Sequence, residues 1–293
     1  MQAQQEMIAE QPEENGASAV ADAADGADGT DTAVRAGKED RHFVTALARG
    51  LDVLACFRSF DTVLGNAEIA QRCGLPKSTV SRLTHTLTEL GYLQPLYEPA
   101  RYRLGSSALA LAPAAQQGAE VLAVVRPHMQ RLAELSQGVA SLIVRDRAHM
   151  MIFENCQSES YLTLRVAVGT RISGLATAAG RAYLDALGGI DQRRAVAAFR
   201  GRDGIDAARA DAILATSHDE VKRLGCTTSF GEWLPHINSI AAAFRPGPAL
   251  PPMTLSCSGP AAIVPAAQLL DTVRPHLLAS IRKIETALGV TAG

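Results

Sequence analysis

The segment from residue 66 to residue 93, NAEIAQRCGLPKSTVSRLTHTLTELGYL, most constrains what this chain can fold into. Asn66 is a suitable cap for a short helix, and Gly74 can adopt the positive φ of a sharp turn. Pro76 suits the first position of a second helix. Apolar side chains recur at helical spacing along that second helix, at Val80, Leu83, Leu87 and Leu90. The segment therefore predicts two helices joined by a tight turn.

The side of the second helix opposite this apolar stripe is polar. Hydroxyl, imidazole and guanidinium groups there suit base edges and phosphates, and the N–H groups of a helix N-terminus suit a phosphate. We therefore predict a DNA-binding helix, although an amphipathic helix pair that binds nothing is the alternative. The predicted DNA contacts of this helix are Lys77, Ser78, Thr79, Ser81, Arg82 and His85.

A hairpin is predicted directly after the helix pair, with strands at 91–96 and 101–104 around a turn at 97–100. Arg101 and Arg103 lie two residues apart, so a strand points both to one side, with Tyr102 and Leu104 inward. An arginine-bearing hairpin after two such helices is typical of a winged helix, and suits phosphate or minor-groove contact. We therefore add both arginines to the predicted DNA contacts.

A further helix is predicted before the pair, from residue 44 to residue 60. Its apolar residues recur at three- and four-residue steps, and we expect this stripe to pack under the other two helices. The residues of the stripe are Leu47, Leu51, Leu54 and Phe57.

Charge is unevenly distributed, although the formal net charge is only −2. Residues 1–40 carry ten acidic and two basic side chains and no aromatic residue, which predicts a disordered acidic arm. Residues 41–105 carry a net charge of +3. A basic head can bind DNA locally even though the whole chain is slightly acidic.

Several function classes lack their sequence signals. No run of 18 apolar residues and no secretory signal is present, so we expect a cytoplasmic protein without a membrane span. The five cysteines and the histidines show no metal-ligand spacing, so we expect no metal site and no cofactor. Catalytic motifs such as G-x-S-x-G and H-E-x-x-H are absent, and we predict no catalytic residue.

Two other functions stay open from the residues alone. One is a hydrolytic or other enzyme in the C-terminal part, with the winged helix as an interaction module. The other is a winged helix that binds protein instead of DNA. Neither an enzyme nor a protein adaptor should show salt-sensitive binding to duplex DNA.

From residue 138 the pattern changes to mixed strands and helices. Strands are predicted at 139–144, 150–153, 161–168, 226–229, 239–244 and 253–258. Helices are predicted at 177–187, 192–199, 206–224 and 265–288, after an amphipathic helix at 119–136. This order indicates an α+β domain that could enclose a small ligand.

The chain resembles the isocitrate lyase regulator (IclR) family of bacterial transcription factors. The residues that carry the resemblance of the head are 48–54, 68–70, 74–80, 82–83, 90–92 and 101–105. The resemblance continues to about residue 288 and implies a C-terminal effector-binding domain with a GAF-like fold. It predicts that an effector, a small carboxylate or aromatic acid, controls DNA binding.

The resemblance also implies an effector site, carried over by position. Gly174, Leu175, Ala178, Ala179 and Gly180 fall in a glycine-bounded loop and helix start, where N–H groups could meet a carboxylate. The other implied ligand residues are Ser256 and Ser258 on one strand, Ser239 on another, and Glu232 in the loop before it. Trp233 lies beside that loop, although a core position is the commoner role for tryptophan.

These predictions divide the chain into four parts. They are an acidic arm (1–40), a winged helix-turn-helix (41–105), a linker helix (106–119) and an effector-binding domain (120–293). The helix at 119–136 resembles the family's dimer-forming connection. Packing within its own domain is the alternative, and the two do not exclude each other. We expect a homodimer or homotetramer on near-palindromic double-stranded DNA.

Overall fold

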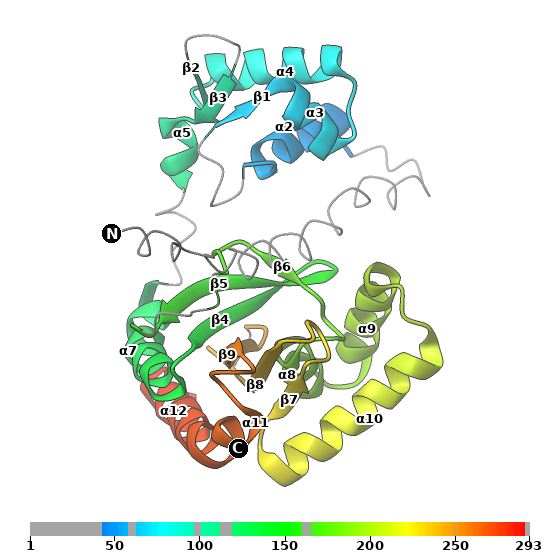
Figure 1. Ribbon diagram of the computed structural model, residues 1–293. Helices are drawn as coiled ribbons and strands as arrows, with labels where there is room; N and C mark the ends of the chain where they lie inside the picture. The colour runs from blue at the N-terminus through cyan, green and yellow to red at the C-terminus, as the bar shows by residue number, and fades with distance from the viewer. Residues whose placement is uncertain are drawn as a thin grey trace, which may run out of the picture.

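The computed structural model describes residues 43–57, 63–96, 101–111, 119–159, 164, 166–248 and 250–290. We call residues 43–111 the head and residues 119–290 the body, and describe each separately (Figure 1). The predicted acidic arm and the wing turn at 97–100 lie outside the described residues. The head contains α2 (Thr45–Ala55), β1 (Leu64–Gly65), α3 (Asn66–Cys73), α4 (Lys77–Glu89), β2 (Leu93–Leu96), β3 (Arg101–Leu104) and α5 (Ser106–Leu109).

The head has its own core between α2, α3, α4 and the strands. Its fully buried side chains include Val53, Ile69, Val80 and Leu93, from four different elements. Burial of apolar area from each helix holds the three helices together. The predicted helix pair is therefore present, and Val80, Leu83 and Leu87 of its apolar stripe face the core. Leu90, also predicted in this stripe, follows the last residue of α4 and is 59% exposed.

The predicted packing of α2 is only partly correct. Leu54 and Phe57 pack against the core, but the side chains of Leu47 and Leu51 are 62% and 56% exposed. Val53 and Cys56 are buried instead. The spacing identified an apolar stripe, but at about 100° per residue the buried Val53 and Cys56 lie on a different side of α2 from Leu47 and Leu51, so part of the stripe faces away from the core.

The ends of α3 and α4 differ slightly from the prediction. Asn66 is the first residue of α3, and Gly65 is its cap, with the backbone N–H of Gly65 donating to Glu68 Oε2 at 2.7 Å. Gly74 ends α3 with φ = +61°, as predicted. Pro76 stands one residue before α4 as its cap and not inside it.

The hairpin pairs as predicted, and a third strand joins it. The strand order is β1-β3-β2, all antiparallel, so β2 is an edge strand and tolerates Pro95. Tyr102 packs against the head core. Leu104 is 37% exposed, which contradicts the prediction that it points inward.

The body is an α+β domain. Its strands are β4 (Val139–Asp146), β5 (His149–Gln157), β6 (Arg171–Ile172), β7 (Thr227–Phe230), β8 (Ile237–Phe244) and β9 (Met253–Pro260). Its helices are α7 (Ala119–Ser136), α8 (Ala178–Ala186), α9 (Gly189–Asp203), α10 (Ala207–Leu224), α11 (Ala266–Gln268), a π-helical segment (Leu269–Val273) and α12 (Arg274–Ala287). The predicted closing helix is thus interrupted by the π-helical segment.

The six body strands form one antiparallel sheet in the order β6-β5-β4-β9-β8-β7. The turn between β4 and β5 lies at residues 147–148, where Arg147 has φ = +54°, and Asp146 pairs with His149. Both strands therefore extend beyond the ranges predicted for them, 139–144 and 150–153. The strand predicted at 161–168 falls partly outside the described residues, and β6 lies beyond it.

Helices cover both faces of the sheet (Figure 1). On one face, α7, the π-helical segment and α12 enclose an apolar core, to which Ala140, Leu142 and Leu255 contribute. On the other face, α8 lies against β8 and β9, with α9 and α10 outside it. Directly paired strand residues point to the same side, so the strand register shows which residues share a face. The face that α8 covers is the more polar one.

Candidate functional site

The exposed side of α4 carries the predicted DNA contacts. Val80, Thr84 and Leu87 are buried on its inner side, and Thr79 is half-buried. The exposed side chains form a continuous face that we call the recognition face: Lys77, Ser78, Ser81, Arg82 and His85. Their spacing of one, four, five and eight residues from Lys77 keeps them on one side of a helix. No described side chain caps the N-terminus of α4.

Thr84 fixes α4 to α3, and sequence reasoning missed it. It is fully buried, and its hydroxyl lies 3.1 Å from Asn66 Oδ1 and 3.0 Å from the carbonyl oxygen of Val80. The oxygen that Asn66 was predicted to use as a helix cap therefore accepts from Thr84. Thr84 lies four residues after Val80 and three before Leu87. This helical spacing was the signal in the sequence that could have predicted its burial.

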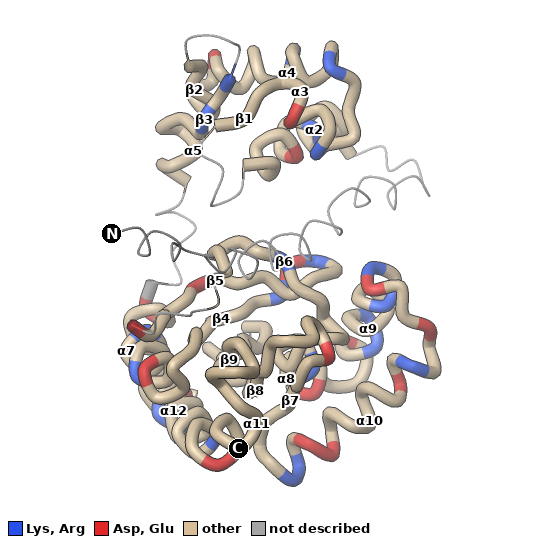
Figure 2. Tube along the Cα trace, in the orientation of Figure 1, with Lys and Arg blue, Asp and Glu red and all other residues tan. Residues whose placement is uncertain are grey.

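The two wing arginines are exposed on β3 and already have partners in the head. Arg101 Nη2 lies 3.5 Å from Glu68 Oε2, and Arg103 Nε donates to Gln94 Oε1 at 3.0 Å. The Gly65 N–H and then the charge of Arg101 lower the pKa of Glu68, so this carboxylate stays charged. A phosphate that binds Arg101 must therefore compete with Glu68. Figure 2 shows basic positions on both β3 and α4.

The polar face of the body sheet carries rows of small hydroxyl side chains. Ser229, Ser239 and Ser258 lie opposite one another across β7, β8 and β9. Two residues along the strands, Ser256 pairs with Ser141 of β4. We call this side, defined by these five serines, the hydroxyl face.

Three of these serines were predicted as ligand residues, and their hydroxyls are uncommitted. Within the part of the chain that the structure describes, Ser239, Ser256 and Ser258 make no side-chain hydrogen bond. Ser141, which sequence reasoning missed, donates to Asn155 Oδ1 at 2.6 Å. Buried polar groups normally have hydrogen-bond partners. Because these three hydroxyls have none among the described residues, they are available to a polar ligand.

The start of α8 lies over the same face. The side chains of Thr227 and Thr254 donate to the carbonyl oxygens of Ala178 and Ala179, at 2.7 and 3.3 Å. Both threonines lie two residues before a serine of the hydroxyl face, so they point to its side of the sheet. These two hydrogen bonds hold the N-terminus of α8 against the hydroxyl face.

Of the three N–H groups predicted to meet a carboxylate, one already has a partner within the helix cap. The N–H of Gly180 donates to Thr177 Oγ1 at 3.2 Å, so the cap of α8 already uses it. Ala178 and Ala179 are buried, and no hydrogen bond from their N–H groups to another described residue is present. A carboxylate could accept from these two donors.

The predicted glycines serve close packing. A Cβ on Gly180 would lie 2.2 Å from the carbonyl oxygen of Gly174, and a Cβ on Gly174 would lie 2.2 Å from the ring of Phe199. Leu175, also predicted as a ligand residue, is fully buried in the body core. These three residues therefore position the helix start, and none offers a polar side chain to a ligand.

Glu232 belongs to an ion pair that sequence reasoning did not find. Arg181 is only 7% exposed, and its Nη2 lies 2.6 Å from Glu232 Oε2. Its other groups donate to the carbonyl oxygens of Leu175 and Thr228, at 2.9 and 3.1 Å. Arg181 thus ties the loop, α8 and β7 together, and Glu232 neutralises its charge. Trp233 is half-buried against the same core.

Two family models match the chain. The IclR helix-turn-helix domain matches residues 46–96, and the model described as bacterial transcriptional regulator IclR C-terminal matches residues 113–286. The chain belongs to the IclR family of bacterial transcriptional regulators. The predicted family and fold class, a winged helix-turn-helix with a GAF-like α+β domain, are confirmed, and this IclR-family member is a DNA-binding transcriptional regulator.

Individual relatives agree with this assignment. The HTH-type transcriptional regulator TsaQ1/TsaQ2 of Comamonas testosteroni is 28% identical, over 84% of this chain and 88% of its own length. An IclR family transcriptional regulator from Brucella abortus has 34% identity and a TM-score of 0.68, covering 85% of this chain and 94% of that one. An IclR homolog from Microbacterium hydrocarbonoxydans, complexed with 4-hydroxybenzoate, has 21% identity and a TM-score of 0.68, covering 84% and 100%. This last likeness shows the fold.

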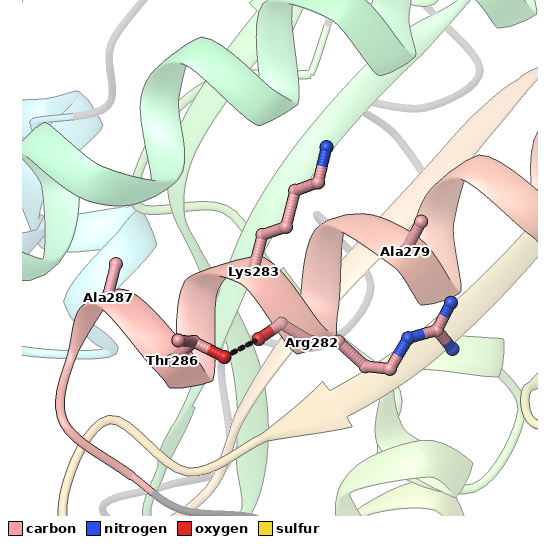
Figure 3. Close-up of a pocket in the computed structure, with 5 residues that line it drawn as sticks. All are labelled: Ala279, Arg282, Lys283, Thr286 and Ala287. Atoms are coloured by element: carbon pink, nitrogen blue, oxygen red, sulfur yellow. Dashed lines mark hydrogen bonds between the residues drawn. The ribbon is translucent and has the colours of Figure 1, made fainter.

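Other features of this IclR-family chain lie away from these two sites. A shallow hollow on α12 is lined by Ala279, Arg282, Lys283, Thr286 and Ala287, and contains none of the predicted site residues (Figure 3). Among the described residues, no helix is long and apolar enough to cross a membrane. The same part of the chain holds no group of three or more His, Cys, Asp or Glu arranged to share a metal ion.

Proposed function

We propose that this regulator binds a near-palindromic operator in double-stranded DNA through the recognition face and the wing. A small carboxylic acid, aromatic by preference, binds against the hydroxyl face and controls this binding. The relatives are transcriptional regulators, so we assign the body a binding pocket and no catalytic residue. A regulator of transcription acts where the chromosome is, which in a bacterium is the cytoplasm.

The recognition face supports the DNA-binding part of the proposal. Arg82 stands at its centre, and no described residue pairs with its guanidinium. Ser78, Ser81 and His85 offer both donors and acceptors to base edges. Lys77 and the N-terminus of α4, which no described side chain caps, suit a phosphate. Arg101 and Arg103 add charge from the wing.

The hydroxyl face carries the effector part of the proposal. Among the described residues, the hydroxyls of Ser239, Ser256 and Ser258 and the N–H groups of Ala178 and Ala179 have no hydrogen-bond partner, and α8 brings these N–H groups to the side of the hydroxyls. N–H groups of a helix N-terminus favour an anion, and hydroxyls can bind the ligand's polar substituents. The 4-hydroxybenzoate bound by a protein of the same fold has a carboxylate, which is the anion, and a hydroxyl, which is a polar substituent.

The exposed apolar side of α2 supports a symmetric homodimer or homotetramer. Leu47 and Leu51 of the helix are 62% and 56% exposed one turn apart, and Val44, the residue before α2, is 61% exposed. An exposed apolar strip on a small domain marks an interaction surface. A second copy of the head is the partner we propose, because a near-palindromic operator needs two heads related by a two-fold axis.

Two measurements test the proposal on the full chain. First, operators are selected from a random duplex pool, and binding is followed by fluorescence anisotropy between 50 and 200 mM salt. We expect affinity to fall by roughly 10³-fold or more if about six or more phosphates are contacted. Duplex binding that is absent, or insensitive to salt, would contradict the DNA-binding proposal.

Second, thermal unfolding is measured with benzoate, 4-hydroxybenzoate, succinate and the neutral isostere benzamide. An acid at about 100 times its dissociation constant should stabilise the body by about 2.7 kcal/mol. Benzamide should give little or no shift, because it lacks the charge that the α8 N-terminus favours. A shift with benzamide equal to that with benzoate would contradict the carboxylate site, and no shift with any acid would contradict the effector class.

A further inference from the structure

The two cysteines of the head lie side by side at the ends of different helices. Cys56 follows the last residue of α2, and Cys73 is the last residue of α3. Their Sγ atoms are 2.8 Å apart. A separate contact holds the same two helix ends together, because Arg72 Nη1 donates to the carbonyl oxygen of Cys56 at 2.8 Å. The contact between the two helix ends therefore holds the thiols close to each other.

The pair is in the thiol form here, and little movement separates it from a disulfide. A disulfide requires a sulfur–sulfur distance of about 2.0 Å, so the Sγ atoms would approach by roughly 0.8 Å from their present 2.8 Å. Both residues also pack at the head core, Cys56 buried and Cys73 half-buried. Cys73 is thus the more accessible of the two to a small oxidant.

The three cysteines of the body are in a different environment. Cys156, Cys226 and Cys257 are buried. Burial raises the pKa of the Cys226 thiol to about 11 and that of the Cys257 thiol to about 12, and it also raises the pKa of Cys156. Because the thiolate is the reactive form, we expect peroxide to oxidise these three buried thiols less readily than an ordinary thiol.

We propose that Cys56 and Cys73 form a reversible intramolecular disulfide, with a hydroperoxide as the oxidant. The Cys73 thiolate attacks one peroxide oxygen: an S–O bond forms and the O–O bond breaks. The alkoxide or hydroxide that leaves takes up the proton that the Cys73 thiol released, and becomes an alcohol or water. The Cys56 thiol then attacks the Cys73 sulfur. The S–S bond forms, the S–O bond breaks, and the hydroxyl leaves as water with the Cys56 proton. The two sulfurs lose two electrons, which the peroxide gains, and a dithiol returns them by exchange.

The disulfide crosslinks α2 to α3 and stabilises the head. It closes the chain from residue 56 to residue 73 into a loop, which restricts the unfolded head more than the folded one. Because Thr84 and Asn66 already hold α3 to α4, the crosslink connects α2 with both helices of the helix-turn-helix. We expect the midpoint of the head unfolding transition to rise on the order of 10 °C in the oxidised protein.

Peptide mapping of the full chain tests the proposal directly. The protein is treated with hydrogen peroxide or dithiothreitol, alkylated with iodoacetamide, and digested with trypsin without reduction. Cleavage after arginine and lysine places Cys56 in the peptide 50–58 and Cys73 in the peptide 73–77. Peroxide should produce these two peptides joined, two hydrogen atoms lighter than their sum, and dithiothreitol should abolish the joined species.

Matched variants separate this pair from the other thiols. Cys73→Ser should remove both the joined peptide and the rise in midpoint, whereas Cys156→Ser should keep both. Three outcomes would overturn the proposal: oxidation of Cys73 alone to sulfinic acid, crosslinking between two chains, or crosslinking that involves a body cysteine. If Cys73→Ser does not fold, the peptide map of the unmodified sequence still decides.

Discussion

Arg82 is the side chain on which the DNA-binding proposal depends most directly. It lies on the recognition face between Ser81 and the turn that carries His85, and within the described residues its guanidinium has no partner. Arginine pairs with guanine through two hydrogen bonds, which gives both affinity and discrimination. Lys77, at the start of the same helix, is better placed for a phosphate.

We expect Arg82→Ala to lower affinity for the selected operator by about 1–3 kcal/mol if Arg82 reads a base. If Arg82 binds only phosphate, the loss should be similar on every duplex, with a shallower dependence on salt. Anisotropy titrations on the operator and on a scrambled duplex distinguish these cases. Arg209→Ala on α10, an exposed arginine of the body, is the matched control. Binding unchanged by Arg82→Ala would remove Arg82 from the interface.

At the scale of the element, α2 shows how one helix can serve two purposes. One side of α2 places Val53 in the head core, and another side leaves Leu47 and Leu51 exposed. Full burial of an exposed leucine side chain is favourable by about 1.5–3 kcal/mol. A two-fold interface buries the same leucine in both copies of the chain, so each position contributes twice. Burial of Leu47 and Leu51 would therefore contribute favourable free energy to the association of two heads.

Leu51→Glu should weaken pairing of the heads by about 2 kcal/mol or more, because a charge would be buried against apolar side chains. We expect weaker binding to the full near-palindrome, with binding to a single half-site unchanged, in electrophoretic mobility assays. Leu250→Glu changes a leucine of similar exposure in the body and should leave both unchanged. Equal loss on the half-site would mean that Leu51 supports the fold of the head instead.

At the scale of the whole molecule, the proposed function requires the body to communicate with the head. An effector can change operator affinity only as far as it binds two arrangements of the regulator with different affinity. The hydroxyl face and the recognition face lie in separate domains, so a pocket variant should change the response without changing the basal DNA-binding surface.

Ser258→Leu tests this separation. The leucine would fill space beside Ser239 and Ser256, so the thermal shift caused by the acid that acts on the unmodified protein should disappear. Operator affinity without effector should stay the same, and Ser258→Ala should weaken the shift less. A lower melting temperature without effector, with operator binding lost, would instead assign Ser258 a structural role.

The sequence alone determined the features that depend on neighbours along the chain. Helical spacing identified α3 and α4 as a pair, Gly74 marked the turn, and the Arg101–Arg103 alternation predicted the wing. The ordered match of many short motifs identified the family. These signals are local because propensity, capping and periodicity act over a few residues.

Only the tertiary structure decided which surfaces are covered and which distant residues meet. It left Leu47 and Leu51 exposed, buried Thr84, and paired Arg181 with Glu232. It aligned Ser239 with Ser258 through strand register, and brought Cys56 to Cys73. The physical reason is common to all of these: periodicity specifies an apolar or polar side, but only packing and register determine what that side contacts.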